Sequence, residues 1–152
     1  MRDYLHARQY TVLRFLDEGA TAKVYEIRNS EGRKLAAKIL PQSLGSTTQE
    51  VKLLQMLKHP CIAQVETIMQ TTNYWTIVTE LASEGDLITH IEHLAKPNIP
   101  QSRTWLRQVA EAVAYLHDQG VAHRDIKADN VLLFKVSRIF IFFFSNLTLA
   151  SR

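Results

Sequence analysis

The spacing of apolar residues changes near residue 85, and this change constrains the fold more than any other feature of the chain. Before residue 85, short runs rich in β-branched and aromatic residues alternate with turns, which is typical of strands. After it, apolar residues recur three and four positions apart, which is typical of helices. The sequence therefore predicts an α+β fold, with a sheet-forming half followed by a helical half.

Five runs in the first half are predicted to form antiparallel strands. Turns around Gly19 and at residues 29–32 separate the first three runs. Thr47 and Glu50 stand at capping-box spacing, which predicts the start of a helix. His59 and Pro60 end that helix. We expect strands at 10–16, 22–28, 34–39, 62–70 and 74–80, and the helix at 47–58.

The second half is predicted to contain two helices, at residues 86–94 and 102–119, with a break at 98–100 between them. Gly120 is the expected C-terminal stop of the longer helix. Apolar side chains recur at helical spacing along that helix and are assigned to the core. They are Trp105, Leu106, Val109, Val113 and Leu116.

Composition bears on three properties of the protein: nucleic-acid binding, disulfide bonds and membrane insertion. The net charge of +3 comes from Lys and Arg that do not cluster, so we expect no nucleic-acid partner. The single Cys61 excludes an internal disulfide and fits a reducing compartment. The longest apolar run near the C-terminus, 139–144, is far shorter than the ~20 residues that a bilayer requires. We therefore expect a cytoplasmic protein that does not bind a membrane.

Residues 123–130 read His-Arg-Asp-Ile-Lys-Ala-Asp-Asn, a polar loop between apolar runs. Upstream, Lys38 is the last residue of a Leu-Ala-Ala-Lys run within the third predicted strand. Glu50 lies on the predicted helix that follows. In this order, these features resemble a eukaryotic-type protein kinase of the serine/threonine class. The resemblance implies a small lobe, with a five-stranded antiparallel sheet plus one helix, and the first helices of an incomplete large lobe.

The resemblance also divides the chain. It covers residues 10–134, with the small lobe at 10–80, the hinge at 79–85 and the partial large lobe at 86–134. Residues 1–9 would be an N-terminal extension, and 135–152 a hydrophobic tail outside the family pattern. Leu106, Val109, Val113 and Leu116 would normally pack against later helices of the large lobe. We expect the tail to cover part of this stripe and the remainder to allow self-association.

The catalytic roles follow from the resemblance. Asp125 would be the base that accepts the proton of a protein hydroxyl, and Lys127 would neutralise the γ-phosphate of ATP. Asn130 would be a Mg²⁺ ligand. The partners implied are ATP, Mg²⁺ and a protein substrate.

The same resemblance assigns the residues that bind ATP. Lys38 would pair with the α- and β-phosphates, with Glu50 as its ion-pair partner. Backbone groups of Glu80 and Ala82 would bind adenine, with Thr79 as the gatekeeper. The remaining positions are Gly19 in the phosphate loop, Asp86 near the ribose, and Val24, Ala36 and Leu132 around the adenine ring.

Several of these residues have a second interpretation that the sequence leaves open. Glu50 would also close the capping box with Thr47. Asp86 would also serve as a carboxylate at a helix N-terminus, favoured by the helix dipole. Val24, Ala36 and Leu132 would also serve as core residues.

Two departures from the family pattern bear on activity. Between the first two strands only Gly19 remains of three glycines, and Asp17 and Glu18 would repel phosphates. After Asp129 the chain has no Asp or Glu, so the D-F-G motif, whose Asp binds Mg²⁺, is absent. We therefore expect a serine/threonine kinase by family, truncated before D-F-G and inactive. The alternatives are a non-catalytic fragment that binds a nucleotide or a protein, and a product without a stable fold.

Overall fold

The computed structural model describes residues 5–6, 8–19, 22–42, 47–94, 96, 98–134, 138–141 and 148–149. At residues 47–50, 52 and 148–149 it describes the backbone only. The chain forms two compact units. The first unit comprises Met1–Val51 and Val65–Leu81, and the second comprises Lys52–Gln64 and Ala82–Arg152.

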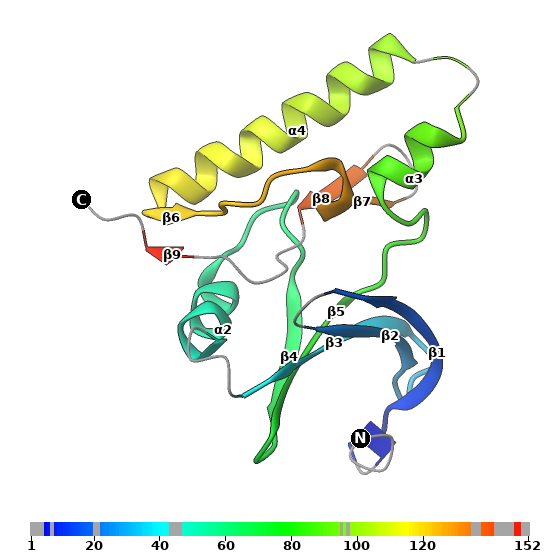
Figure 1. The fold of residues 1–152 in the computed structure, drawn as a ribbon, viewed down its shortest axis with the longest axis vertical. Coiled ribbons are helices and arrows are strands. Elements are labelled where there is room, and N and C mark those ends of the chain that lie inside the picture. Colours follow the sequence, from blue (N-terminus) through cyan, green and yellow to red (C-terminus); the bar gives the residue numbers. More distant parts are fainter. Residues whose placement is uncertain are drawn as a thin grey trace. The chain divides into compact units, whose positions relative to one another are not determined.

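A five-stranded sheet forms the first unit, in the order β1-β2-β3-β5-β4 (Figure 1). Every neighbouring pair of strands is antiparallel, so the predicted five-stranded antiparallel sheet is confirmed. The strands are β1 (Thr11–Glu18), β2 (Lys23–Arg28), β3 (Lys34–Pro41), β4 (Val65–Gln70) and β5 (Tyr74–Glu80).

An apolar core covers one face of this sheet. Alternate residues of a strand point to opposite faces, and the side chains that share this face are buried together. They are Ile27, Leu35, Ala37, Met69 and Val78, with Leu5 packed among them. Leu5 has no exposed surface, so part of the segment interpreted as an N-terminal extension belongs to the core of the first unit.

Several predicted boundaries in the first half differ from the structure. Strands β1 and β3 extend to Glu18 and Pro41, beyond the predicted residues 16 and 39. Helix α2 (Thr47–Met56) ends before the predicted residue 58. Strand β4 begins at Val65 because the backbone at the predicted start, Ile62, is used elsewhere. The amide of Ile62 closes a turn onto the carbonyl of His59 at 3.0 Å, and Ile62 forms a parallel bridge with Ile141. The predicted capping box depends on the side chains of Thr47 and Glu50, which lie outside the described residues.

Among its described residues, the second unit contains the end of α2, two further α-helices, one 3-10 helix and four short strands, with α4 lying along β6 and β8 (Figure 1). The helices are α3 (Leu87–Glu92), α4 (Ile99–Asp118) and the 3-10 helix η1 (Ala128–Asn130). The strands are β6 (Val121–Ala122), β7 (Val131–Phe134), β8 (Arg138–Ile141) and β9 (Thr148–Leu149). Strand β7 pairs with β8, and β6 pairs with β9.

The predicted break at 98–100 was wrong, because these residues begin the long helix. Asn98 is the N-cap of α4, and its Oδ1 accepts a hydrogen bond from the amide of Gln101 at 3.1 Å. Pro100 is tolerated there because amides in the first helical turn have no partner within the helix.

The apolar stripe of α4 is only partly buried. Trp105 and Leu116 are buried, and Trp105 packs with Val131, Leu133 and Ile139. Val109 of the stripe packs against this cluster, to which β8 contributes Ile139, so part of the stripe is covered as expected of the tail. Leu106 is 69% exposed, so its assignment to the core was wrong. Helical spacing alone does not show how wide the buried face of a helix is.

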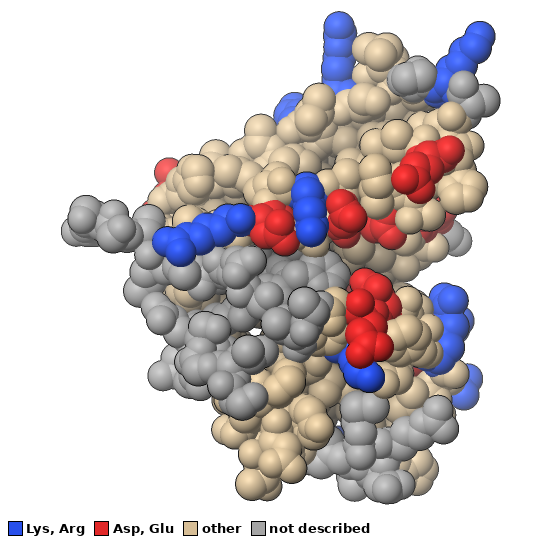
Figure 2. Space-filling model, in the orientation of Figure 1, with Lys and Arg blue, Asp and Glu red and all other residues tan. Residues whose placement is uncertain are grey.

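Charged side chains are interleaved on the part of the visible face that the structure describes, with Lys and Arg beside Asp and Glu (Figure 2). Within the described residues, no helix is both long enough and apolar enough to cross a bilayer.

Candidate active site

The lysine predicted to bind phosphate is a buried cation. Lys38 lies in the middle of β3, opposite Val24 of β2 and Ile77 of β5, and only 1% of it is exposed. An ammonium group removed from water requires compensation by charge or hydrogen bonds, so burial at this position is typical of a functional lysine. The side chain of Glu50 lies outside the described residues, so its ion pair with Lys38 stays a prediction.

Three predicted nucleotide-binding residues share one face of the sheet with Lys38. Opposite residues of paired strands point to the same face, and Val24 lies opposite Lys38. Ala36, two residues before Lys38, lies opposite Thr79. All four are buried on the face opposite the Leu5 core. The first unit thus brings Val24, Ala36, Lys38 and Thr79 together, as the resemblance implied.

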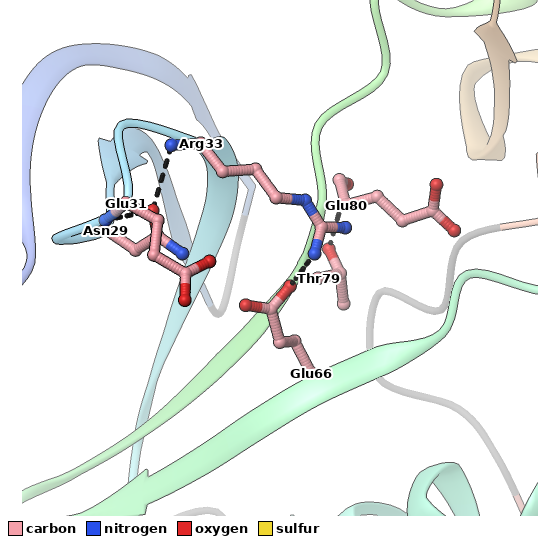
Figure 3. Close-up of polar contacts among 6 residues, drawn as sticks. All are labelled: Asn29, Glu31, Arg33, Glu66, Thr79 and Glu80. Atoms are coloured by element: carbon pink, nitrogen blue, oxygen red, sulfur yellow. Dashed lines mark hydrogen bonds and ion pairs between the residues drawn. The ribbon is translucent and has the colours of Figure 1, made fainter.

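Polar contacts hold the end of the sheet where β3 begins and β5 ends (Figure 3). Asn29 Oδ1 accepts hydrogen bonds from the amides of Glu31 and Arg33 and so shapes the turn after β2. Arg33 then reaches Glu66 of β4, at 2.9 Å between Nη1 and Oε2. Figure 3 shows this ion pair next to Thr79 and Glu80, where Thr79 Oγ1 donates to the carbonyl of Glu80 at 3.3 Å.

The two ends of the β1–β2 connection carry opposite charges. The amide of Gly19 donates to the carbonyl of Ala22 at 2.9 Å, which closes the loop. Glu18 lies opposite Lys23, and their charged groups are 3.0 Å apart. This hydrogen bond to Glu18, together with the attraction between the two charges, raises the pKa of Lys23. Because Lys23 neutralises part of the charge of Glu18, the repulsion of phosphate expected from Glu18 is reduced.

The second unit holds the other predicted ATP-binding residues. Asp86 Oδ1 accepts a hydrogen bond from the amide of Thr89 at 2.7 Å and caps α3, so its helix-terminal role is present. Asp86 also forms a bridge with Leu132 of β7. Leu132 is half-buried and packs against Ala63 and Phe140, while Ala82 is half-buried in the segment before α3.

The polar loop 123–130 brings together the three predicted catalytic and metal-binding residues. Asn130 Nδ2 donates to both the carbonyl oxygen and Oδ2 of Asp125, at 2.7 and 2.8 Å. Lys127 Nζ lies 3.7 Å from Asp125 Oδ2. Asn130 is 2% exposed, so the loop is anchored at this end. The Asp125 side chain is 35% exposed and remains accessible as a base.

The start of the loop is anchored by His123, which is also buried. Its Nδ1 accepts a hydrogen bond from the amide of Asp125 at 3.2 Å. Between these two residues, Arg124 has a φ of 62°, in the left-handed region that residues other than glycine rarely adopt. Such strained backbone clusters at functional sites, where the surrounding contacts impose it.

The residues present do not complete a Mg²⁺ site. A metal would be held by Asn130 Oδ1, since Nδ2 donates to Asp125 and cations bind carbonyl oxygens. Among the described residues, no group of three or more His, Cys, Asp or Glu could hold a metal ion. The sequence contains no Asp or Glu after Asp129. A second carboxylate of the kind that kinases use is therefore missing from the segment that follows the loop.

Sequence reasoning missed one buried charge on the face of the sheet that carries Lys38. Glu26 lies opposite Ala36 and is 3% exposed. Its carboxylate binds Arg14 Nε at 2.6 Å and Lys34 Nζ at 2.8 Å. The hydrogen bonds from Lys34 and Arg14 lower the pKa of Glu26. Alternation along β2 places residue 26 on the same face as Val24, and a carboxylate on such a face indicates an ion pair.

We expect Glu26→Gln to destabilise the protein by about 1–3 kcal/mol at neutral pH, because it removes charge-assisted hydrogen bonds. A carboxyl whose pKa is lowered by folding adds stability above its unfolded pKa of about 4.3, and that stability is lost as the pH falls through the folded pKa. Urea unfolding between pH 3 and pH 7 should therefore show a flatter pH dependence for Glu26→Gln. Glu31→Gln, at an exposed turn, should keep the parent's dependence. If the free energy of unfolding changed with pH equally in the parent and in Glu26→Gln, Glu26 would not be the carboxyl responsible.

Known proteins resemble the chain in both sequence and structure. Residues 10–144 match the protein kinase domain family, and this match continues past Phe134 and takes in β8. The chain is 36% identical over 147 residues to the serine/threonine-protein kinase srk1 of Schizosaccharomyces pombe, covering 85% of this chain and 25% of that protein. It is 34% identical over 139 residues to the probable serine/threonine-protein kinase fhkD of Dictyostelium discoideum, covering 86% and 19%.

A solved structure shares the arrangement of the chain. The crystal structure of Rad53 1-466 in complex with AMP-PNP matches with a TM-score of 0.83 and 27% sequence identity, over 92% of this chain and 39% of that one. The chain thus spans a quarter or less of the length of the two curated relatives above.

Proposed function

The chain belongs to the eukaryotic-type serine/threonine protein kinase family, and from this premise we propose that it is the ATP-binding, catalytic-loop part of such a kinase. The observation that carries the proposal is the group formed by Asp125, Lys127 and Asn130, joined by contacts of 2.7 to 3.7 Å. In this family that group transfers the γ-phosphoryl of ATP to a protein serine or threonine. The protein substrate therefore belongs to the proposal as well.

The proposed roles come from the family resemblance, and within each unit the surroundings of the side chains are compatible with them. Asp125 is accessible and held by Asn130, which suits a base that accepts a hydroxyl proton. Lys38 supplies the buried positive charge for the α- and β-phosphates. Val24, Ala36 and Leu132 offer apolar contacts to the adenine ring. Backbone groups of Glu80 and Ala82 provide its hydrogen bonds.

Transfer itself is proposed to be absent from this chain. Phosphoryl transfer relies on metal ions that neutralise the charge developing between the β- and γ-phosphates. Asn130 offers a neutral oxygen, and no carboxylate follows it in the sequence. The chain as given would then bind ATP weakly and leave it intact, which is the non-catalytic alternative for the same site.

Binding of ATP tests the proposal directly. We expect Lys38→Met to weaken the affinity for a fluorescent ATP analogue roughly ten- to a hundredfold, since a hydrogen bond to a charged group contributes about 1.5–3 kcal/mol. The matched control is Lys58→Met, because Lys58 is exposed. It should bind as the parent does. Equal affinities for Lys38→Met and the parent, both folded, would remove Lys38 from the site.

Self-association is a second proposal, supported by apolar side chains that the structure leaves in contact with water. Leu106 is 69% exposed and Met56 is 75% exposed. We expect Leu106→Lys to lower the weight-average mass measured by sedimentation, because burying a leucine side chain contributes about 1.5–3 kcal/mol. Lysine is well tolerated on an exposed helical face, so the unfolding midpoint should stay unchanged. A parent that is monomeric at high concentration would contradict the proposal.

A cytoplasmic location is proposed from the single cysteine. Cys61 is a buried free thiol, and burial raises its pKa, which keeps it protonated and unreactive. Such a thiol fits a reducing compartment, where ATP is also available. Fractionation of cells that express a tagged chain tests this location.

A further inference from the structure

Strand β8 is the place where three segments of the second unit meet. On one side it pairs with β7, with Val131 opposite Ile141 and Leu133 opposite Ile139. On the other side, the amide of Ile141 donates to the carbonyl of Cys61 at 2.9 Å, and the amide of Ala63 donates to the carbonyl of Ile141 at 3.3 Å. Residues 61–63 therefore take the position of a neighbouring strand.

One side chain completes this edge of β8. Gln108 projects from α4, and its Oε1 accepts a hydrogen bond from the amide of Ile139 at 3.0 Å. The same oxygen lies 3.8 Å from Cys61 Sγ. Ile139 has no exposed surface, so water cannot replace this acceptor without opening the packing. A buried amide that loses its acceptor is costly. Gln108 thus joins α4, β8 and the segment around Cys61.

The partner strand of β8 connects directly to the catalytic loop. Strand β7 begins at Val131, immediately after Asn130, whose side chain holds Asp125. At the other end of the loop, β6 precedes His123 and pairs with β9. The pairs that β7 forms with β8 and β6 forms with β9 therefore flank the loop at its two ends. A shift of β8 would be transmitted through β7 to Asn130.

We propose that Gln108 is a positioning residue for the catalytic loop. By fixing β8 against residues 61–63, it fixes β7 and the contact between Asn130 and Asp125. The contacts of Gln108 that carry this inference are with Ile139 and Cys61, which have no assigned role in ATP binding or catalysis. The inference deepens the proposed function, since it assigns a support to the same site.

The test compares three variants of the full chain. Gln108→Leu keeps the size of the side chain and removes the acceptor of the Ile139 amide. Gln108→Glu keeps an oxygen that can accept this hydrogen bond. Gln101→Leu is the matched control on the first turn of α4, where Gln101 is half-buried. The readouts are hydrogen exchange of the amides of Asp125 and Asn130, exchange of Ala37 and Ile39 in the first unit, and affinity for an ATP analogue.

In Gln108→Leu we expect the amides of Asp125 and Asn130 to exchange roughly tenfold faster, the change that follows from weakening one buried hydrogen bond by about 1.4 kcal/mol. The Ala37 and Ile39 amides should keep their rates, and ATP affinity should fall several-fold. Gln108→Glu and Gln101→Leu should match the parent. If Gln108→Leu does not fold, the shorter Gln108→Asn, measured in the same way, takes its place.

Two outcomes would overturn the inference. In one, exchange accelerates at Ile139 and stays unchanged at Asp125 and Asn130. In the other, exchange accelerates equally in both units, which indicates global destabilisation. Failure of the proposed function looks different. Suppose the parent binds no ATP analogue, but the loop amides still exchange selectively faster in Gln108→Leu. The positioning role of Gln108 would then hold, and the proposed ATP binding would be wrong.

Discussion

The 152-residue chain, incubated with labelled ATP, Mg²⁺ and a basic protein substrate, should transfer no label above a reaction without protein. The reason is electrostatic. In this family metal ions carry the charge that develops on the transferring phosphoryl group, and carboxylates hold those ions. The chain retains the base, Asp125, and the amide ligand, Asn130. It has no Asp or Glu after Asp129.

Asp125→Asn is the control that decides this prediction. If the parent is inactive, the variant changes nothing, because the base has no reaction to assist. Label transfer by the parent that disappears in Asp125→Asn would show that the chain is a working kinase and that a carboxylate after Asn130 is dispensable. The same assay on an active family member confirms that the substrate and the metal are suitable.

A pair of substitutions tests whether the missing carboxylate is what prevents Mg²⁺ binding. Phe143 lies thirteen residues after Asn130, close to the spacing at which kinases place the Asp of D-F-G, and Phe144 and Ser145 follow it. Phe143→Asp with Ser145→Gly writes Asp-Phe-Gly into the sequence. We expect ATP affinity to become dependent on Mg²⁺ in this double variant and to be independent of it in the parent. Affinities that Mg²⁺ leaves unchanged in both would place the defect elsewhere.

Local patterns were sufficient to predict the parts of the fold that local chemistry determines. Alternating β-branched residues and short turns predicted all five strands of the first unit, and the resemblance of the polar loop to a kinase loop assigned Asp125, Lys127 and Asn130 to one site. In each case the residues involved are close in the chain or follow a simple period. The strand order β1-β2-β3-β5-β4 was not predicted, since alternation alone does not say which strands become neighbours.

Residues that depend on distant partners escaped prediction. Nothing near Leu5 in the sequence shows that it will pack against Ile27 and Val78. Glu26 is buried because Arg14 and Lys34 reach it from the neighbouring strands. Gln108 bonds to a strand that lies thirty-one residues further along the chain. Prediction failed for a different reason at Pro100, which was interpreted as a break although the first helical turn tolerates proline.

The tail shows most clearly how non-local packing changes the interpretation of a sequence. Residues 135–152 were predicted to be a hydrophobic tail outside the family pattern. Yet Ile139, Phe140 and Ile141 of β8 are at most 2% exposed, and Phe140 packs against Leu132 and Ala63. The rings of Phe134 and Phe140 are 4.2 Å apart between centroids, and the Arg138 guanidinium lies over both. Strand β8 is thus part of the core of the second unit.

Phe140→Ala should therefore destabilise the second unit by about 3–5 kcal/mol, the usual cost of truncating a buried phenylalanine. The cost has two sources, because the substitution removes apolar surface from a buried environment and leaves a cavity between Leu132 and Ala63. Amide exchange under native conditions measures this cost in each unit separately. The second-unit amides of Asp125, Asn130 and Ile141 should exchange by a lower-energy opening, while Ala37 and Ile39 of the first unit keep their rates.

Phe15→Ala is the matched control, since Phe15 is 51% exposed and has one edge-to-face contact with Tyr25, so removing it should cost about 1 kcal/mol. If Phe140→Ala were as mild as Phe15→Ala, β8 would be a loose attachment to the second unit. Strand β8 would then give no support to β7 and Asn130. A large and local effect would instead show that a segment without any metal-binding carboxylate still holds the catalytic loop in place, so that the loop can be well formed in a chain that transfers no phosphate.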